Sequence, residues 1–191
     1  SQLYKWSIEN IPDFWAAMWE FGNVIASRKY DKAVDDLSKF PGAKWFVGAR
    51  LNFAENLLRY KDNREAFIFR GETQKSAKIT YAELYNQVAR LAKSLREIGV
   101  ILGDRVVAYM PNLMETTIAM LAATSIGAVW ASCGADLGAS AALDRLGQIE
   151  PKVLFTADGY WYKAKVFNTL PNAEIIAKNI PSLEKVVVVS Y

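Results

Sequence analysis

Side chains suited to nucleophilic or metal chemistry are scarce in this chain of 191 residues. It contains one cysteine, Cys133, and no histidine. Without histidine, neither a Ser–His nor a Cys–His nucleophile pair can form within the chain, and no zinc site is expected. Cys133 stands in a Trp-Ala-Ser-Cys-Gly stretch, and we interpret it as a small core residue in preference to a nucleophile. A single cysteine forms no intrachain disulfide, which fits a reducing compartment, and we expect a cytoplasmic protein.

Glycine-rich phosphate-binding motifs are also missing. Gly134 and Gly138 do not have the spacing of a dinucleotide fingerprint, and Gly42 and Gly48 lie one residue too far apart for a Walker-type loop. The adjacent acids Asp35-Asp36 are interpreted as a solvated face, and no carboxylate cluster has metal-binding spacing. The residues alone therefore predict an α/β chain that contains neither a catalytic constellation nor a metal site.

Composition and charge indicate an ordinary globular protein. The chain is 52% hydrophobic and 23% charged, with a formal net charge of +3. No block of basic residues occurs, so charge predicts neither a nucleic-acid nor a membrane partner. The start of the chain, residues 1–10, does not resemble a signal peptide, and the longest apolar run, residues 116–130, is shorter than the ~18 residues of a membrane span.

The first part of the chain, residues 1–64, is rich in aromatic residues and loop signals. A helix is expected over residues 13–25, with Asp13 as its cap and an apolar face of aromatic side chains. We interpret these aromatics as packing groups that lie on another surface, with a ligand platform as the alternative. Three residues are expected to brace this leader against the core: Lys44, Trp45 and Arg50.

The second part, residues 65–191, begins with an expected hairpin and continues as alternating helices and strands. Thr80 and Glu83 have the spacing of a capping box, and Gly99 is expected to close that helix in the left-handed conformation. Gly127 and Gly138 are interpreted as glycines that serve the backbone conformation and not a ligand. The expected elements are strands 66–69 and 78–81 around a turn at 71–76, helix 80–98, strand 106–110, helix 114–126, strand 128–132, a loop at 134–138, helix 139–146, strand 153–156, helix 160–170 and strand 185–189.

The strands near the end of the chain are continuous apolar runs, such as Val186–Val189. Such runs are typical of a parallel sheet that is covered on both faces. Together with the alternation of strand and helix, they predict an α/β fold with a mostly parallel sheet flanked by helices. Because the chain stops directly after such a strand, we expect it to be a piece of a longer protein.

Several stretches, in this order and spacing, resemble the adenylate-forming acyl-CoA synthetases. The leader segment Gly42–Leu58 is more similar to the acetoacetyl-CoA branch of that family than to the acetyl-CoA branch. The resemblance implies the first part of the large AMP-binding domain at 65–191, after a family leader at 1–64. The stretches that carry it are Ile79-Thr80-Tyr81-Ala82-Glu83-Leu84, Gly103-Asp104-Arg105-Val106, Tyr109-Met110-Pro111-Asn112, Gly127-Ala128-Val129 and Pro151-Lys152-Val153-Leu154-Phe155.

The resemblance implies a reaction in two steps. An acid, here acetoacetate, reacts with ATP to give an acyl-adenylate and pyrophosphate, usually with magnesium, and the thiol of CoA then displaces AMP. The family's phosphate loop, adenine motif, ribose-binding Asp and catalytic Lys have no counterpart in residues 1–191, so this chain alone is expected to be inactive and no catalytic residue is assigned. Another short- or medium-chain acid and a non-catalytic α/β binding module remain alternatives.

The resemblance also implies contacts to CoA. A Gly-Gly turn that approaches CoA in related acetyl-CoA synthetases aligns with Ala135 and Asp136, so the two glycines themselves are lost here. Two phosphate-binding arginines of those enzymes fall near Tyr162 and Lys165, with Lys163 one position away, and Lys163 and Lys165 are the candidates to replace them. Lysines can act as point-charge phosphate ligands, although they lack the fork of arginine. The alternative is that both are ordinary solvated lysines on a helix. Arg145 is expected to tie its helix to the domain by hydrogen bonds.

Overall fold

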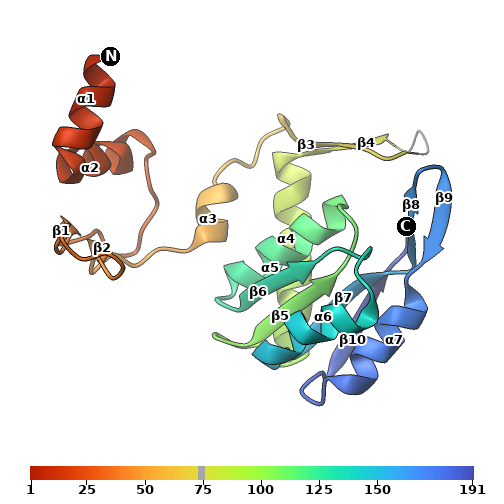
Figure 1. Ribbon diagram of the computed structural model, residues 1–191. Helices are drawn as coiled ribbons and strands as arrows, with labels where there is room; N and C mark the ends of the chain where they lie inside the picture. Colours follow the sequence, from red (N-terminus) through yellow and green to blue (C-terminus); the bar gives the residue numbers. More distant parts are fainter. Residues whose placement is uncertain (73–75) are drawn as a thin grey trace. The chain divides into compact units, whose positions relative to one another are not determined.

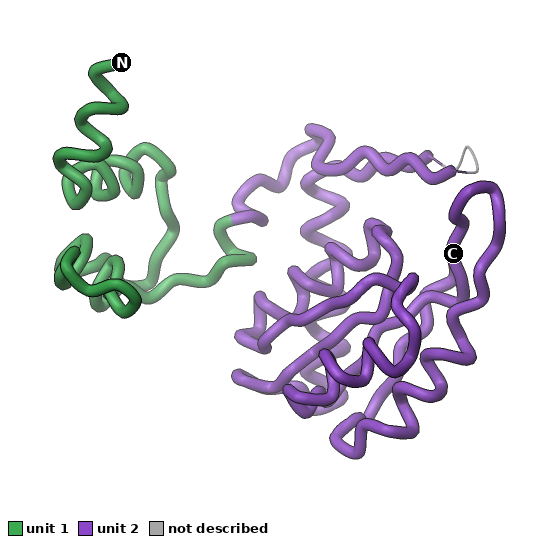
Figure 2. The backbone as a smooth tube through the Cα atoms, viewed as in Figure 1, with its two compact units in different colours: residues 1–56 green, residues 57–191 purple. Residues whose placement is uncertain are grey.

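The computed structural model describes residues 1–72 and 76–191. These residues form two compact units, Ser1–Asn56 and Leu57–Tyr191, which are coloured separately in Figure 2. In the described part of the chain, no helix combines the length and the apolar character that crossing a bilayer demands.

Unit 1 holds two helices and a small antiparallel sheet. Helix α2 begins at Ile11 because Pro12 is tolerated in a first helical turn, so Asp13 lies inside the helix and its expected role as the cap is wrong. The preceding helix α1, capped by the Ser1 hydroxyl, was not anticipated. The elements are α1 (Gln2–Glu9), α2 (Ile11–Phe21), β1 (Lys32–Val34) and β2 (Trp45–Val47), followed by α3 (Phe53–Leu57), which crosses into unit 2.

An aromatic cluster forms the centre of unit 1. The ring of Trp19 lies 5.1 Å from that of Tyr30 and 4.9 Å from that of Phe46, and the last two rings are 5.2 Å apart. Trp19 is buried, so α2 is held against the β1–β2 segment by this contact. The aromatic-rich leader is therefore confirmed, whereas its packing on a further surface stays a prediction.

Unit 2 is built on a four-stranded sheet in which every neighbouring pair is parallel. The order across the sheet is β10 (Lys185–Val189), β7 (Val153–Ala157), β5 (Arg105–Tyr109) and β6 (Val129–Cys133). Helices α4 (Tyr81–Glu97) and α5 (Met114–Ser125) pack together, and α6 (Ala139–Leu146) packs with α7 (Leu170–Asn179) on the other face (Figure 1). The expected α/β fold with a parallel, helix-flanked sheet is confirmed.

One core cluster lies between the sheet and the second helix pair. Its strand members are Val107, Tyr109 and Leu154, all fully buried, and its helical members come from α6 and α7. Strand β7 is buried along its whole length, but β10 is the edge strand, with Val186 and Val188 exposed at 43% and 52%. Val186–Val189 is therefore only partly covered in the described chain, and its burial on both faces stays a prediction.

Two antiparallel hairpins extend from unit 2. The first pairs β3 (Glu65–Arg70) with β4 (Ser76–Thr80); part of the turn expected at 71–76 lies outside the described residues. The second pairs β8 (Gly159–Tyr162) with β9 (Lys165–Asn168), so the helix expected over 160–170 is wrong. A helix follows only afterwards, as α7, which starts with Leu170-Pro171.

Helix α4 begins with the expected capping box. The Thr80 hydroxyl accepts a hydrogen bond from the Glu83 amide at 3.2 Å, and the Glu83 carboxylate accepts one from the Thr80 amide at 2.8 Å. These bonds satisfy two amides that a helix start otherwise leaves unpaired, and they hold the pKa of Glu83 below its usual value.

We expect Thr80→Ala to weaken the first turn of α4 by roughly 1 kcal/mol, because the cap hydroxyl is lost. Hydrogen exchange of a peptide covering this turn in the full-length protein should accelerate about fivefold. Ser94→Ala, at an exposed position later in the same helix, is the control and should leave exchange nearly unchanged. Equal exchange in the two variants would contradict the capping role.

Candidate functional site

The topology of the sheet opens a crevice at the carboxyl ends of β5 and β6. These strands are neighbours, but the chain leaves β5 towards α5 on one face and leaves β6 towards α6 on the other. Loops that diverge in this way leave a gap between adjacent strands, which is where ligands of open α/β sheets bind.

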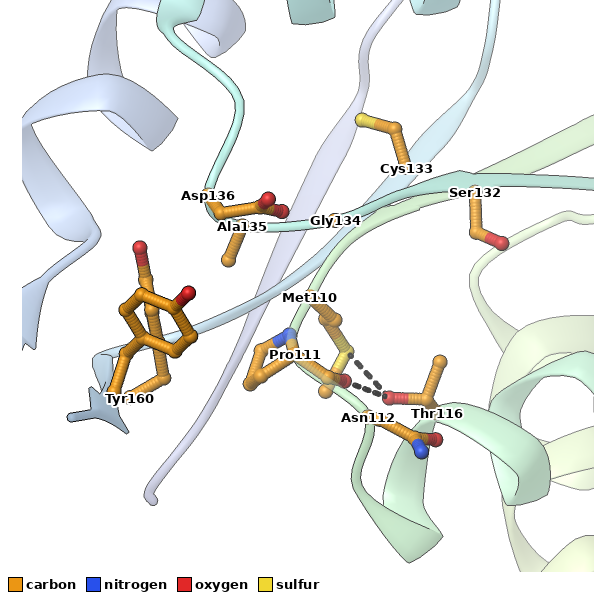
Figure 3. A pocket seen from close by; sticks show the side chains of 11 residues that line it. Met110, Pro111, Asn112, Thr116, Ser132, Cys133, Gly134, Ala135, Asp136 and Tyr160 are labelled. Atoms are coloured by element: carbon orange, nitrogen blue, oxygen red, sulfur yellow. Dashed lines mark hydrogen bonds between the residues drawn. The ribbon is translucent and has the colours of Figure 1, made fainter.

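A pocket of about 590 Å³ occupies this crevice (Figure 3). One wall is the segment after β5, a second is the segment after β6, and the third comes from β8. The Thr116 hydroxyl, on α5, donates a hydrogen bond to the Pro111 carbonyl at 3.0 Å and so holds the first wall. The lining residues are Met110, Pro111, Asn112, Thr116, Ser132, Cys133, Gly134, Ala135, Asp136, Tyr160 and Tyr162.

The loop after β6 places Ala135 and Asp136 in the pocket wall, where Figure 3 shows the Asp136 carboxylate turned back towards Gly134. A Cβ atom on Gly134 would lie 2.3 Å from an Asp136 carboxylate oxygen, so the absence of a side chain at Gly134 permits this close approach. Ala135 is buried and Asp136 is exposed. The only side-chain charge that lines the pocket among the described residues is therefore the negative charge of Asp136.

Cys133 lines the pocket but is poorly suited to nucleophilic chemistry. Burial raises the pKa of its thiol, and the positive charge of Arg145 only partly offsets that effect. A thiol with a raised pKa is protonated at neutral pH, and the thiol is much less nucleophilic than the thiolate. Cys133 also packs against the core cluster, in agreement with its interpretation as a small packing residue.

Strand β8 contributes two aromatic residues to the pocket: Tyr160, which the sequence did not identify, and Tyr162, which aligns near an arginine of the related enzymes. The Tyr160 ring stacks on Phe167 of β9, with centroids 5.2 Å apart and planes 13° from parallel. Burial and the nearby Asp136 carboxylate raise the pKa of Tyr160, so its hydroxyl is a neutral donor. The alternating pattern of a hairpin would have pointed to both tyrosines, but this segment was interpreted as helical.

Lys163 and Lys165 lie at the tip of the β8–β9 hairpin, not on a helix. Lys163 and Ala164 form its two-residue turn with φ values of 51° and 58°, and Lys165 opposes Tyr162 in the ladder. Both lysines are exposed, and the Lys163 ammonium lies 5.2 Å from the ring centroid of Tyr162. The hairpin thus connects the two lysines to the pocket through Tyr162, although neither lysine lines it.

One other expectation at this site is wrong. Arg145 is exposed in the last turn of α6, and its guanidinium forms no hydrogen bond within the part of the chain that the structure describes. Gly99 and Gly127 have positive φ values of 84° and 80°, a conformation that favours glycine. Gly138 is the N-cap residue of α6, with φ of −65°.

Metal-ligating residues do not gather in the described structure. Among residues 1–72 and 76–191, no three His, Cys, Asp or Glu side chains are grouped so that they could hold a metal ion. The crevice therefore offers a carboxylate, tyrosine hydroxyls and backbone groups to a ligand, with two ammonium groups on the adjoining hairpin.

Comparison with known proteins gives two family matches. Residues 53–191 match the family described as AMP-binding enzyme, and residues 1–57 match the acetyl-coenzyme A synthetase N-terminus. An acetoacetyl-CoA synthetase from Gallus gallus is 43% identical over 100% of this chain and 29% of that protein. The acetoacetyl-coenzyme A synthetase of Rhizobium meliloti (strain 1021) is 44% identical over 93% of this chain and 27% of that protein.

A solved structure, acetoacetyl-CoA synthetase from Streptomyces lividans, matches with a TM-score of 0.91 at 41% identity, over 96% of this chain and 29% of that one. The chain thus spans less than a third of the length of these relatives. The AMP-binding match covers more than half of the chain, including the whole parallel sheet and the crevice. The chain therefore belongs to the AMP-binding enzyme family.

Proposed function

We propose that this chain is the N-terminal part of an ATP-dependent acid–CoA ligase that acts on acetoacetate. The whole enzyme would join acetoacetate to ATP, release pyrophosphate, and transfer the acyl group from the adenylate to the thiol of CoA with release of AMP. The observation that carries the proposal is the likeness to the Streptomyces lividans acetoacetyl-CoA synthetase, which extends over 96% of the chain.

We propose that the crevice between β5 and β6 receives CoA. Ala135 would let the backbone approach the ligand closely, and the Asp136 carboxylate would accept a hydrogen bond from an amide N–H of the pantetheine arm. A carboxylate repels phosphate, so the phosphates would lie away from Asp136, near Lys163 and Lys165 on the hairpin. The exposure of both ammonium groups and their link to the pocket through Tyr162 support this division.

We propose that ATP and magnesium bind to other parts of the full-length enzyme. The described residues include no metal-ligating cluster, and residues 1–191 contain no glycine-rich phosphate loop of the family type. We propose residues 1–64 as the leader, residues 65–191 as the first part of the AMP-binding domain, and a reducing, cytoplasmic location in keeping with the single cysteine. The role of this chain would then be confined to CoA binding and to the scaffold.

A second acid is a specific alternative. A malonamoyl-CoA synthetase from Penicillium aethiopicum is 39% identical over 97% of this chain, close to the identity of the acetoacetyl relatives. A protein named for another short acyl group thus contains a region similar to nearly the whole of this chain. Membership of the AMP-binding enzyme family argues against the alternative of a non-catalytic binding module.

The test is AMP formation by the full-length protein with ATP, magnesium and CoA. We expect release to be much faster with acetoacetate than with acetate, butyrate or malonamate. Equal or faster release with another of these acids would refute acetoacetate as the substrate and keep the ligase. No AMP with any acid would refute the ligase itself.

A further inference from the structure

Tyr109 is the last residue of β5, and its side chain is fully buried. Its hydroxyl lies 2.8 Å from the carbonyl oxygen of Ala135 and 2.6 Å from that of Leu137. The side-chain amide of Asn172, on α7, donates a hydrogen bond to the same hydroxyl at 3.1 Å. One phenol group therefore joins β5, the loop after β6 and α7.

The hydroxyl has only one proton to donate. Because Asn172 occupies a lone pair of the oxygen, the proton is left to the two loop carbonyls, which share it. Burial raises the pKa of Tyr109, so the group remains a neutral donor across the physiological range. The proton of this hydroxyl is thus directed at the loop.

The two carbonyls belong to the residues on either side of Asp136. Few other backbone bonds hold this loop: the Leu137 amide donates to the Gly134 carbonyl at 3.3 Å, and the Met110 amide donates to the Cys133 carbonyl at 3.2 Å. The hydroxyl of Tyr109 therefore fixes where the backbone of Asp136 lies in the pocket wall, although Tyr109 itself does not line the pocket.

We propose that Tyr109 is a positioning residue for the thioester-forming step, acting through the loop that holds Ala135 and Asp136 against CoA. The inference rests on the proposed function, since it needs CoA in the crevice. It concerns the second half-reaction only, because adenylate formation does not use CoA.

The test is Tyr109→Phe in the full-length enzyme, which removes the hydroxyl and keeps the ring. We expect the KM for CoA to rise about five- to tenfold, the scale of one lost buried hydrogen bond. Acid-dependent exchange of pyrophosphate into ATP, which reports the first half-reaction, should change less than about twofold. Asn172→Ala, at a partly buried position on α7, should shift the KM for CoA in the same direction by a smaller factor.

Thr156→Val is the matched control. The Thr156 hydroxyl is fully buried and donates to the backbone carbonyl of Tyr109 at 3.0 Å, so its loss removes a hydrogen bond at the same residue without touching the loop. We expect the same fall in thermal stability as in Tyr109→Phe, with an unchanged KM for CoA.

Two results would overturn the inference while leaving the proposed ligase intact. One is an active Tyr109→Phe enzyme with an unchanged KM for CoA. The other is an equal loss in both half-reactions, matched by Thr156→Val, which would mean a purely structural role. If the wild type forms AMP and Asp136→Ala leaves the KM for CoA unchanged, CoA binding at this loop is refuted, and the inference with it.

Discussion

Reversing both hairpin charges, with Lys163→Glu and Lys165→Glu, should raise the KM for CoA of the full-length enzyme by about 30- to 100-fold. Each exposed lysine contributes about 0.5 to 0.7 kcal/mol to binding a phosphate, and a glutamate in its place adds repulsion of similar size, so the double reversal costs about 2 to 3 kcal/mol. Pyrophosphate exchange into ATP should be unchanged, because the first half-reaction proceeds without CoA. The KM should be measured with CoA and with dephospho-CoA, which lacks the 3′-phosphate.

The control keeps the charge change but moves it elsewhere. Lys93 lies on α4 and Lys185 at the first residue of β10, so Lys93→Glu with Lys185→Glu alters the net charge equally, away from the carboxyl edge of the sheet. We expect this pair to change the KM for CoA by less than about threefold. The KM of the wild type should rise with salt, more steeply than that of the hairpin variant, because salt screens the lysine–phosphate attraction. Equal effects of the two pairs would mean that only net charge matters, and the hairpin would not be the phosphate site.

The elements that the sequence predicted best are those with clear local signals, such as boundary residues or an unbroken apolar run. Helix α6 lies at 139–146 and strand β10 at 185–189, as expected, because the first is bounded by glycines and the second is an unbroken valine run. The capping box at Thr80 was equally clear, since Thr and Glu at that spacing pair with each other's backbone amides at the start of a helix.

The β8–β9 hairpin was missed because its turn lacks the usual residues. A two-residue turn with both φ values positive favours Asn and Gly, yet Lys163 and Ala164 occupy it here. The pairing that imposes this conformation involves strands rich in aromatic and β-branched residues, a signal that was interpreted as helical. The same error hid the fact that Tyr160 and Tyr162 line the pocket, which they reach from the extended strand β8.

The composition of a strand also does not determine whether it lies at the centre or at the edge of a sheet. The apolar runs Val153–Ala157 and Lys185–Val189 look alike in sequence, but the first is central and the second lies at an edge. Sequence reasoning brought Ala135 and Asp136 to the site through a family resemblance, not through chemistry. Their contacts to CoA, like those of the two lysines, stay predictions.

The difference between a central and an edge strand leads to a large expected effect on stability. Leu154→Ala should weaken β7 by about 2 to 5 kcal/mol, because Leu154 is fully buried in the core cluster and its truncation leaves a cavity. Hydrogen exchange of β7 amides in the full-length protein should accelerate by about 30-fold or more, since each 1.4 kcal/mol corresponds to roughly a factor of ten.

Val186→Ala, on the edge strand β10, is the matched control. Val186 is 43% exposed, so the variant removes less buried surface and should change the same exchange rates by less than about fivefold. If the two variants had equal effects, β10 would be covered in the full-length protein by a further segment or subunit. In that case the valine run would be buried on both faces, as its sequence pattern predicts. An effect of Val186→Ala well above the fivefold limit would therefore indicate that another part of the protein covers this edge.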